Sequence, residues 1–544
     1  MSKLNAAAVA AMVAAAFVAG CQLATTPHFG PYVTNVTGTS AEVLWVTPKD
    51  AASSQVVVAQ GPNAAIKVKT TTQRVDSQME TLHIAKVTGL EAGKSYDYMM
   101  QFNPPFQTVG SRSGNFRTDP GPDADAPLHF AVYGDTRTYP DRHKLVATAL
   151  DKEGPLDFVV QSGDLVADGR KWPLWKKQFF DPAQEMLRHT TIWPVLGNHE
   201  YDGILAQQLF DFPKSYHSID FGNVHFVLLN SELKPGKADP EMLAWLEKDL
   251  AASKATWKLV SYHRPTFDVI THRTTFGQRD LLPVLQRGGV DIVMNGHTHN
   301  YQRFRPIGDP GQKPVIFCVS AGGGAPNYAV NPGPILEKAY SGLNYCVFDV
   351  KGNTLEMTAK YPDGKTLDHL KLVKTDGMYQ KEVMDRAIST DFARQAAFLL
   401  TGFFAHSPTP PAPGQLFPLF ISPLSFPEGA EVEVGMADIG TPKPGEIING
   451  VWTIPPVKLT GFKATPGVDE DHTGGAVFTP LVMMVRAPAD VHFTDKGALE
   501  PPIRISVTVH YKGQTYTNHN TGVYFRTLTL KSWQAQRDAW AISR

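Results

Sequence analysis

The 544-residue chain has a globular composition, with 42% hydrophobic and 19% charged residues, and its formal net charge is −1. This length predicts roughly three or four domains with full cores. The near-neutral charge argues against the basic face that sequence-independent binding of nucleic acid requires, so no nucleic-acid partner is expected. No segment after the N-terminus reaches about 18 consecutive apolar residues, so no later membrane span is expected.

The N-terminus carries the pattern of a lipoprotein signal peptide at residues 1–20. Lys3 precedes an apolar segment, and the sequence VAGC at 18–21 matches a bacterial lipobox. A signal peptide is removed and takes no part in the fold. The pattern predicts a lipidated Cys21, attachment to a membrane and a place in a bacterial cell envelope. Gln22 favours the outer membrane of a Gram-negative source, and plain secretion is the alternative.

Residues 27–119 are predicted to form an all-β domain, because short alternating strands are separated by turn residues. Trp45 lies in an apolar strand and is expected in the core. Leu90, Gly93 and Tyr96 resemble the tyrosine corner of fibronectin type III sandwiches. This N-terminal β-sandwich is expected to carry no chemistry of its own.

A linker rich in Pro and Gly at 119–123 precedes a predicted α/β domain at 127–375. Short β-branched runs, typical of buried strands, alternate there with helical patterns at 143–152 and 241–252. Asp239 suits the N-cap of the second helix and Pro240 suits its first position. Alternating strands and helices predict an α/β sheet.

Five short polar motifs each follow an apolar run, at 133–137, 163–164, 197–200, 263 and 296–299. The loops at the carboxyl ends of such strands meet at one edge of a sheet, so the motifs are expected to converge. Carboxylate oxygens suit hard cations, imidazoles suit borderline ones, and two neighbouring ions need a bridging ligand. The motifs therefore predict a site for two divalent or mixed-valence ions, with iron, manganese and zinc all open. The predicted metal ligands are Asp135, Asp164, Asn198, His263, His297 and His299.

The ordered motifs resemble those of the calcineurin-like metallophosphoesterases, over about 240 residues. The chain is most similar to the purple acid phosphatase branch, because AWLEKDL precedes the fourth motif, HNYQRFRP follows the fifth, and a fibronectin-like domain stands in front. The resemblance implies a central four-layer α/β fold, a β-sandwich flanked by helices, within a multidomain chain. It also implies a phosphoric ester hydrolase of the acid phosphatase type.

The resemblance assigns a role to each motif residue. Asp164 would bridge the two ions, Asp135 and His299 would complete the first-ion set, and the second-ion set would add Asn198, His263 and His297. His199 would contact the phosphate and help to protonate the leaving group. His272, nine residues past His263, falls where such phosphatases keep a histidine on a substrate loop. In an extended 297–299 segment both imidazoles would share one side, but a local bend could aim them at different ions.

Two positions depart from the family pattern. Arg137 stands where the first motif usually has His or Gly, and a guanidinium cannot donate a lone pair to a metal. Either it pairs with a carboxylate and holds the Asp135 loop, or it donates to a substrate phosphate. Ala167 replaces the tyrosine whose phenolate gives the purple enzymes their colour, so that chromophore is not expected.

Other polar residues have structural interpretations. The triple glycine at 322–324 lacks a following Lys-Ser/Thr, so a tight loop beside the site is preferred over a phosphate cradle. Arg303 and Arg305 suit either ion pairs or substrate contacts. Buried thiols are preferred over a disulfide for Cys318 and Cys346. The histidines outside the motifs are expected to be structural: His129, His143, His189, His217 and His225.

The C-terminal part is predicted as a helical connector at 377–404, a Pro-rich linker at 405–414 and an accessory β domain at 415–544. Alternation around Lys512 and Gly513 indicates a hairpin. No catalytic group of residues is evident there, and an accessory or cell-envelope contact module is expected.

The preferred function is hydrolysis of a phosphate monoester or diester at a dinuclear site. A metal-activated hydroxide would attack phosphorus in line, and His199 would assist the departing oxygen. The alternative is a non-enzymatic, phosphate-binding envelope lipoprotein with a degraded first metal site. A nuclease on the same scaffold is disfavoured by the absence of a basic surface. The sequence does not indicate an oligomeric state.

Overall fold

The computed structural model divides the chain into two compact units. The first unit runs to residue 265 and adds 279–328 and 340–387, and the second comprises 266–278, 329–339 and the chain from 388 onward. Among the described residues, no helix has the length and apolarity that a membrane crossing requires. The structure describes residues 28–390 except 48–53, 60–64, 70, 76–79, 103–111, 123–125, 213, 235, 270–275 and 329–334, and beyond 390 residue 393, residues 413, 414, 489 and 513, and the strands β23 to β31.

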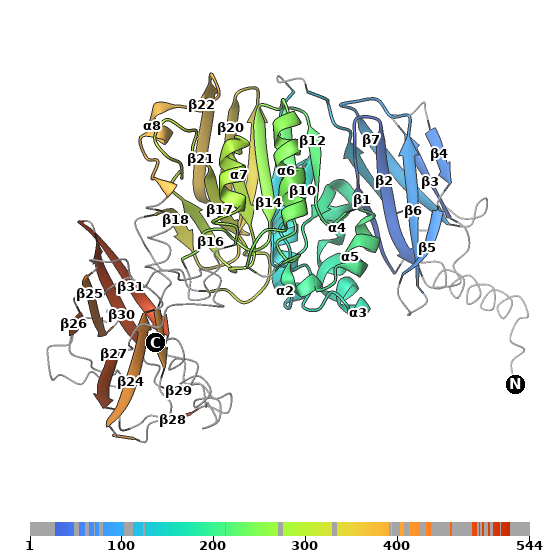
Figure 1. Cartoon of the computed structure of the whole chain (residues 1–544). Coiled ribbons are helices and arrows are strands. Elements are labelled where there is room, and N and C mark those ends of the chain that lie inside the picture. The colour runs from blue at the N-terminus through green and yellow to red at the C-terminus, as the bar shows by residue number, and fades with distance from the viewer. Residues whose placement is uncertain are drawn as a thin grey trace, which may run out of the picture. The chain divides into compact units, whose positions relative to one another are not determined.

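Two antiparallel groups of strands form the N-terminal β region (Figure 1). Trp45 is fully buried between them, as expected, and the Tyr96 hydroxyl accepts a hydrogen bond of 2.8 Å from the backbone N–H of Glu91. The predicted strands are present, and the fibronectin type III assignment stays a prediction. One group has the order β1 (Phe29–Thr34), β2 (Ser40–Thr47), β6 (Glu80–Thr88), β5 (Thr71–Val75); the other has β4 (Ala65–Lys69), β3 (Ser54–Ala59), β7 (Ser95–Phe102), β8 (Ser113–Arg117).

The first sheet of the α/β core continues directly into this N-terminal region. Val33 of β1 pairs in parallel with Thr191 of β11, which joins the two parts into one 11-stranded sheet. The parallel centre consists of β9 (Leu128–Tyr133), β10 (Phe158–Gln161) and β11 (Thr191–Pro194). The antiparallel flank consists of β19 (Tyr345–Lys351), β20 (Thr354–Lys360), β21 (Thr366–Thr375) and β22 (Met378–Tyr379).

A second sheet packs face to face against the first. Phe226 of the second sheet lies edge-on to Phe130 and Phe158 of the first, with ring centroids 6.1 and 6.2 Å apart. These buried rings form the centre of the core. The second sheet includes, in order, β12 (His217–Phe221), β13 (Val224–Leu228), β14 (Trp257–Tyr262), β15 (Ile292–Asn295), β17 (Ile316–Ser320) and β16 (Tyr301–Phe304), and β18 (Leu336–Tyr340) is a further strand.

Helices accompany both sheets, as expected of an α/β fold (Figure 1). The predicted helix at 241–252 is confirmed, and the Asp239 side chain caps it by accepting hydrogen bonds from the N–H groups of Glu241 and Met242. Apolar side chains of α2, α4 and α5 share one buried cluster with Ala131 and Val159 of the first sheet. The helices are α2 (Pro140–Asp151), α3 (Trp172–Leu174), the π-helix η2 (Trp175–Phe180), α4 (Asp181–His189), the 3-10 helix η3 (Asn198–Glu200), α5 (Ile204–Phe210), α6 (Pro240–Ala252), α7 (Leu281–Arg287) and α8 (Lys381–Met384).

The helical connector predicted at 377–404 is wrong for part of its length. Met378 and Tyr379 form β22, because they continue the edge of the first sheet by pairing with β21. Among the described residues of this range, Lys381–Met384, Thr390 and Ala393 are helical. Residues 391–392 and 394–402 lie outside the described residues.

The described C-terminal segments are strands, as predicted. The hairpin around Lys512 and Gly513 is present, with Tyr511 opposite Gln514. The strands are β23 (Phe403–His406), β24 (Leu416–Pro423), β25 (Glu431–Met436), β26 (Val457–Leu459), β27 (Leu481–Arg486), β28 (His492–Phe493), β29 (Leu499–Glu500), β30 (Arg504–Tyr511) and β31 (Gln514–Gly522).

Candidate metal centre

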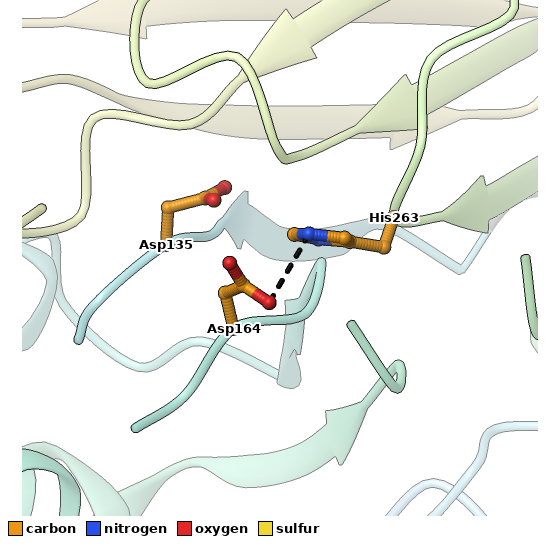
Figure 2. A group of neighbouring side chains, drawn as sticks. All are labelled: Asp135, Asp164 and His263. Atoms are coloured by element: carbon orange, nitrogen blue, oxygen red, sulfur yellow. Dashed lines mark ion pairs between the residues drawn. The ribbon is translucent and has the colours of Figure 1, made fainter. Parts of the chain in front are cut away.

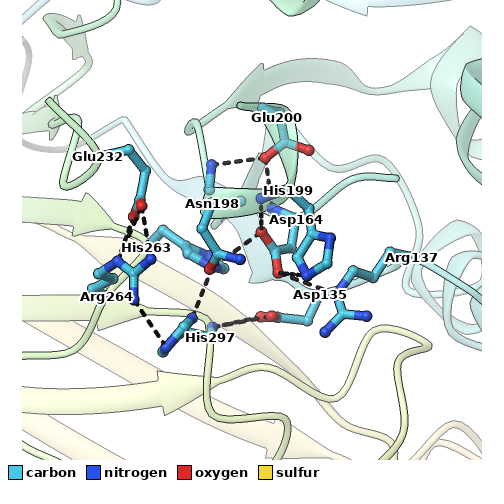
Figure 3. Close-up of polar contacts among 12 residues, drawn as sticks. Asp135, Arg137, Asp164, Asn198, His199, Glu200, Glu232, His263, Arg264 and His297 are labelled. Atoms are coloured by element: carbon cyan, nitrogen blue, oxygen red, sulfur yellow. Dashed lines mark hydrogen bonds and ion pairs between the residues drawn. The ribbon is translucent and has the colours of Figure 1, made fainter. Parts of the chain in front are cut away.

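The five motifs converge at the carboxyl ends of parallel strands, as their positions predicted. Asp135 follows β9, Asp164 follows β10, and Asn198 follows β11 in the first sheet. His263 follows β14 and the 296–299 motif follows β15 in the second sheet. Figure 3 shows these loops meeting, with their polar side chains directed toward one another. His272 lies outside the described residues.

Strained backbone marks three of the predicted ligands. Asp135, Asp164 and His297 have φ angles of 58°, 57° and 71°, in the left-handed region that non-glycine residues rarely adopt. Such strain persists only where the surrounding structure holds it, and it is concentrated at functional sites. A Cβ on Gly163, whose φ is 98°, would lie 2.5 Å from Nδ1 of His263, so the loop approaches too closely for any larger residue.

Asp164 lies at the centre of the site. One ligand atom from each of Asp135, Asp164 and His263 falls within 4.8 Å of the others (Figure 2). Oδ1 of Asp164 is 3.2 Å from Nε2 of His263, and all three side chains are buried. Two carboxylates and an imidazole buried this closely make a natural cation site.

The second-ion set gathers around Nε2 of His263. Nδ1 of this ring donates to the backbone oxygen of Ser162 at 2.9 Å, which turns Nε2 toward the site. Oδ1 of Asn198 lies 3.2 Å from this Nε2 and Nδ1 of His297 lies 3.3 Å from it. With Oδ1 of Asp164, two oxygen and two nitrogen ligands converge, which fits a borderline divalent ion.

The first-ion set is held differently. Nε2 of His299 is 3.3 Å from Oδ1 of Asp135, and Nδ1 of the same ring donates to the backbone oxygen of Pro326. The guanidinium of Arg137 lies among these groups: Nε donates to Oδ2 of Asp164 at 3.2 Å. Its Nη2 is 3.2 Å from Nε2 of His299. A protonated side chain therefore already contacts the groups that would receive the first ion.

The 296–299 motif bends, which decides between the two arrangements left open for its imidazoles. The left-handed φ of His297 sends its ring toward His263, with ring centroids 5.1 Å apart. The ring of His299 faces Asp135 instead. The two imidazoles thus belong to different halves of the site.

Charge and burial set the protonation at the centre. Burial alone raises the pKa of Asp164, but neighbouring cationic groups, first among them His263, outweigh it and lower the pKa. Burial alone lowers the pKa of His263, but Asp164 raises it to about 10. Burial and the charge of His263 lower the pKa of His297 well below its usual value. A carboxylate and a protonated imidazole therefore pair here, and a metal ion would compete with that proton.

Glu200 positions the site, a role that was not predicted. Its buried carboxylate accepts hydrogen bonds from the backbone N–H groups of Asp164 and Leu165 at 2.9 Å, and of Gly197 at 2.7 Å. Burial and the charge of Asp164 raise its pKa to about 8. The available signal was its place three residues after Gly197, where a glutamate commonly satisfies free N–H groups at a helix start.

His199 lies at the rim of the site. Its Nδ1 donates to the backbone oxygen of Ala167 at 2.7 Å, and Nε2 is 3.8 Å from Oδ2 of Asp164. Its backbone N–H donates to Oδ1 of Asp164 at 2.9 Å. The ring is partly exposed, so a substrate can reach it.

The triple glycine at 322–324 forms a tight loop against the first motif, the interpretation that the sequence favoured over a phosphate cradle. The N–H of Gly323 donates to the oxygen of Gly134 at 2.8 Å. A Cβ on Gly323 would lie 2.3 Å from the same oxygen. The loop therefore fixes the segment that carries Asp135 and Arg137.

The remaining residues have structural roles. Arg303 is nearly buried and pairs with Asp368 through two hydrogen bonds of 2.6 and 2.9 Å, which favours the ion-pair interpretation. Cys318 and Cys346 are buried free thiols. The non-motif histidines contact groups outside the site: His129 with Asp349, His143 with Gln178, His189 with Asn115, His217 with Phe212, and His225 with Asp220 and Asp249.

Residues 128–301 match the family model for calcineurin-like phosphoesterases. Purple acid phosphatase 21 of Arabidopsis thaliana is 29% identical over 221 residues, which cover 36% of this chain and 48% of the relative. Tartrate-resistant acid phosphatase type 5 of Sus scrofa is 29% identical over 244 residues, which cover 36% of this chain and 69% of the relative.

The solved structure of purple acid phosphatase PPD1 from yellow lupin (Lupinus luteus) seeds aligns with a TM-score of 0.57 at 18% identity, covering 66% of this chain and 76% of that one. This likeness concerns the fold alone. The chain spans about half the length of the Arabidopsis relative above, 48% of it. Residues 128–301 of this chain form a calcineurin-like phosphoesterase domain with purple acid phosphatase homologues.

Proposed function

We propose that the chain is a metal-dependent phosphoric ester hydrolase, an acid phosphatase-like phosphomonoesterase or phosphodiesterase. The observation that carries the proposal is the second-ion set, in which four oxygen and nitrogen ligands from both sheets converge, one of them Oδ1 of Asp164. This set lies within the matched phosphoesterase segment. A divalent ion held there would lower the pKa of water and neutralise charge on a phosphate.

The chain's own residues supply the other requirements of hydrolysis. Because Nδ1 of His199 donates to the backbone of Ala167, Nε2 faces the site, and in the doubly protonated ring it carries the proton that can pass to a departing oxygen. The guanidinium of Arg137, whose side chain is 15% exposed, carries donors suited to phosphate oxygens. Glu200 and the left-handed turns keep these groups in place before a substrate binds.

The test is phosphate release from a chromogenic monoester and a chromogenic diester. The full-length protein would be stripped of metal and then supplied with manganese, zinc or iron. Hydrolysis of at least one ester, dependent on added metal, is expected. A protein that binds phosphate and metal yet hydrolyses neither ester would overturn the proposal and favour a binding lipoprotein.

We also propose that the protein is exported and anchored to a bacterial membrane by lipid on Cys21. Cys21 lies outside the described residues, and the lipobox at 18–21 supports the proposal. Cys21→Ala should release the exported protein into the soluble fraction, whereas the unchanged chain should fractionate with membranes. A Cys21→Ala protein that still sediments with membranes would exclude the anchor.

A further inference from the structure

The guanidinium of Arg137 engages the ligands of the first-ion set. Its Nε donates to Oδ2 of Asp164, and its Nη2 lies 3.2 Å from Nε2 of His299. Because Nδ1 of His299 donates to Pro326, Nε2 is the acceptor in this contact. Two lone pairs that would bind the first ion therefore accept hydrogen bonds from an arginine.

The backbone on both sides of Arg137 is held in place. Its own N–H donates to the backbone oxygen of Asp164 at 3.3 Å. The N–H of Asp135 donates to Gly163 at 3.0 Å, and that of Thr138 donates to the Gln178 side chain at 3.2 Å. The side chain, anchored again by Nη1 on Oγ1 of Thr138, is therefore directed into the site.

His299 is also held in place, by contacts of its ring and of its backbone. The ring of Tyr328 stacks on it, with centroids 4.3 Å apart and planes inclined by 15°. The backbone oxygen of His299 accepts from the Tyr328 N–H at 3.2 Å and from Nδ2 of Asn327 at 3.1 Å. If the imidazole turned away from Arg137, it would lose its stacking on Tyr328 and its hydrogen bond to Pro326.

The two carboxylate oxygens of Asp164 serve different cations. Oδ1 faces His263 and the second-ion set, while Oδ2 faces Arg137. Figure 3 shows this division, with Arg137 on one side of Asp164 and His263 on the other. Figure 3 also shows Arg264, which pairs with Glu232 at 3.0 Å and whose Nη1 lies 3.4 Å from Nε2 of His297.

Charge opposes a second metal ion beside this arginine. One divalent ion and the guanidinium together already exceed the charge of Asp135 and Asp164. A second divalent ion would add two further positive charges within a few ångströms, in a buried site where repulsion is weakly screened. A histidine at position 137 would avoid this repulsion and add a lone pair.

We infer that the guanidinium of Arg137 takes the place of the first metal ion, so the chain binds one divalent ion tightly, at Asp164, Asn198, His263 and His297. The residues of the first-ion set thus do not fit the two-ion centre that the family resemblance implies. Arg137 supplies a fixed positive charge there instead, directed at the phosphate. The inference rests on the proposed function of this site and specifies its cations.

The test is the metal content of the full-length protein loaded with manganese and dialysed. The unchanged chain and Arg137→Lys should retain roughly one equivalent, and Arg137→His should retain roughly two. Electron paramagnetic resonance gives an independent readout, because neighbouring manganese ions couple magnetically. The unchanged chain should give the spectrum of an isolated ion, and Arg137→His that of a coupled pair. Arg117→Ala, which removes a half-buried ion pair with Asp157 elsewhere, is the matched control and should behave as the unchanged chain.

Two tightly held, coupled ions in the unchanged chain would overturn the inference, as would equal metal content in the unchanged chain and Arg137→His. These outcomes are separable from the proposed function. Two ions with ester hydrolysis would sustain the function and reject the inference. One tightly bound ion without ester hydrolysis would sustain the inference and reject the proposed function.

Discussion

At the scale of single residues, Glu200 has the most specific role outside the ligand sets. One of its oxygens accepts two backbone N–H groups and the other accepts one. In Glu200→Gln an amide N–H would face the N–H of Leu165 or Gly197, leaving buried donors unpaired. We expect a loss of about 1–3 kcal/mol in the free energy of unfolding and weaker metal binding. Chemical denaturation and metal titration measure both. Glu185→Gln, at an exposed glutamate, is the control, and equal behaviour of the two variants would refute the positioning role.

His225 should contribute stability that depends on pH. Burial alone lowers its pKa, but hydrogen bonds to Asp249 and Asp220 outweigh burial and raise it. A histidine pKa raised by folding stabilises fully below the unfolded value of about 6.5, and the effect is lost as pH rises through the folded value. His225→Gln should therefore lower the free energy of unfolding by about 1–2 kcal/mol near pH 5.5 and by less near pH 8.5. This range is kept small because Asp220 is exposed and solvent screens its interaction with His225. Urea denaturation at both pH values measures this, and a cost that grows with pH would contradict it. Activity per folded molecule should not change.

At the scale of elements, β1 belongs to the catalytic core as much as to the N-terminal region. The ring of Tyr32 lies 4.9 Å from that of Phe180 and 5.9 Å from that of Phe210, both from the helical layer. Tyr32 is fully buried. Tyr32→Ala should lower the free energy of unfolding by about 3–5 kcal/mol through the cavity it leaves. Leu145→Ala, at an exposed position on α2, should have little effect. If Tyr32→Ala unfolds the N-terminal region while the catalytic core keeps its full stability, the two are independent.

Strand and helix positions could be predicted where one local signal dominates. The helix at 241–252 has both its cap and its initial proline in the sequence, and each ligand motif directly follows an apolar strand. The pairing of Val33 with Thr191 could not be predicted, because an edge pairing across 158 positions leaves no periodic signal. The apolar pattern at 377–404 predicted a helix, but Met378 and Tyr379 at its start pair with the open edge of β21 and form a strand.

The composition of the candidate site could be predicted, but its internal division could not. The order of the motifs predicted that Asp135, Asp164 and His263 lie close together. One ligand atom from each lies within 4.8 Å of the others. Whether the 296–299 motif runs straight or bends depends on the φ of His297, which the sequence does not specify. The contact of Arg137 with Asp164, 27 positions later, depends on how two loops pack. Two roles were considered for Arg137: pairing with a carboxylate, and donating hydrogen bonds to a substrate phosphate. Both are compatible with this contact.

At the scale of the whole molecule, the two units divide the chain differently from the predicted domains. The second unit takes 266–278 and 329–339 from within the predicted catalytic range, together with the chain from 388 onward. All six predicted metal ligands lie in the first unit. Removal of residues 415–544 should therefore leave metal content unchanged. A soluble, monodisperse truncated protein that no longer binds metal would contradict this.

We propose above that Asp164 anchors a metal-dependent phosphoesterase centre. The most direct measurement is the rate of phosphate release as metal is titrated into metal-free protein, for the unchanged chain and Asp164→Asn. The amide keeps the size of the side chain but removes the charge that both His263 and Arg137 contact. We expect a rate that rises with metal and saturates in the unchanged chain, and a loss of at least about 100-fold in the variant. A rate that is independent of metal, or equal in the two proteins, would contradict it.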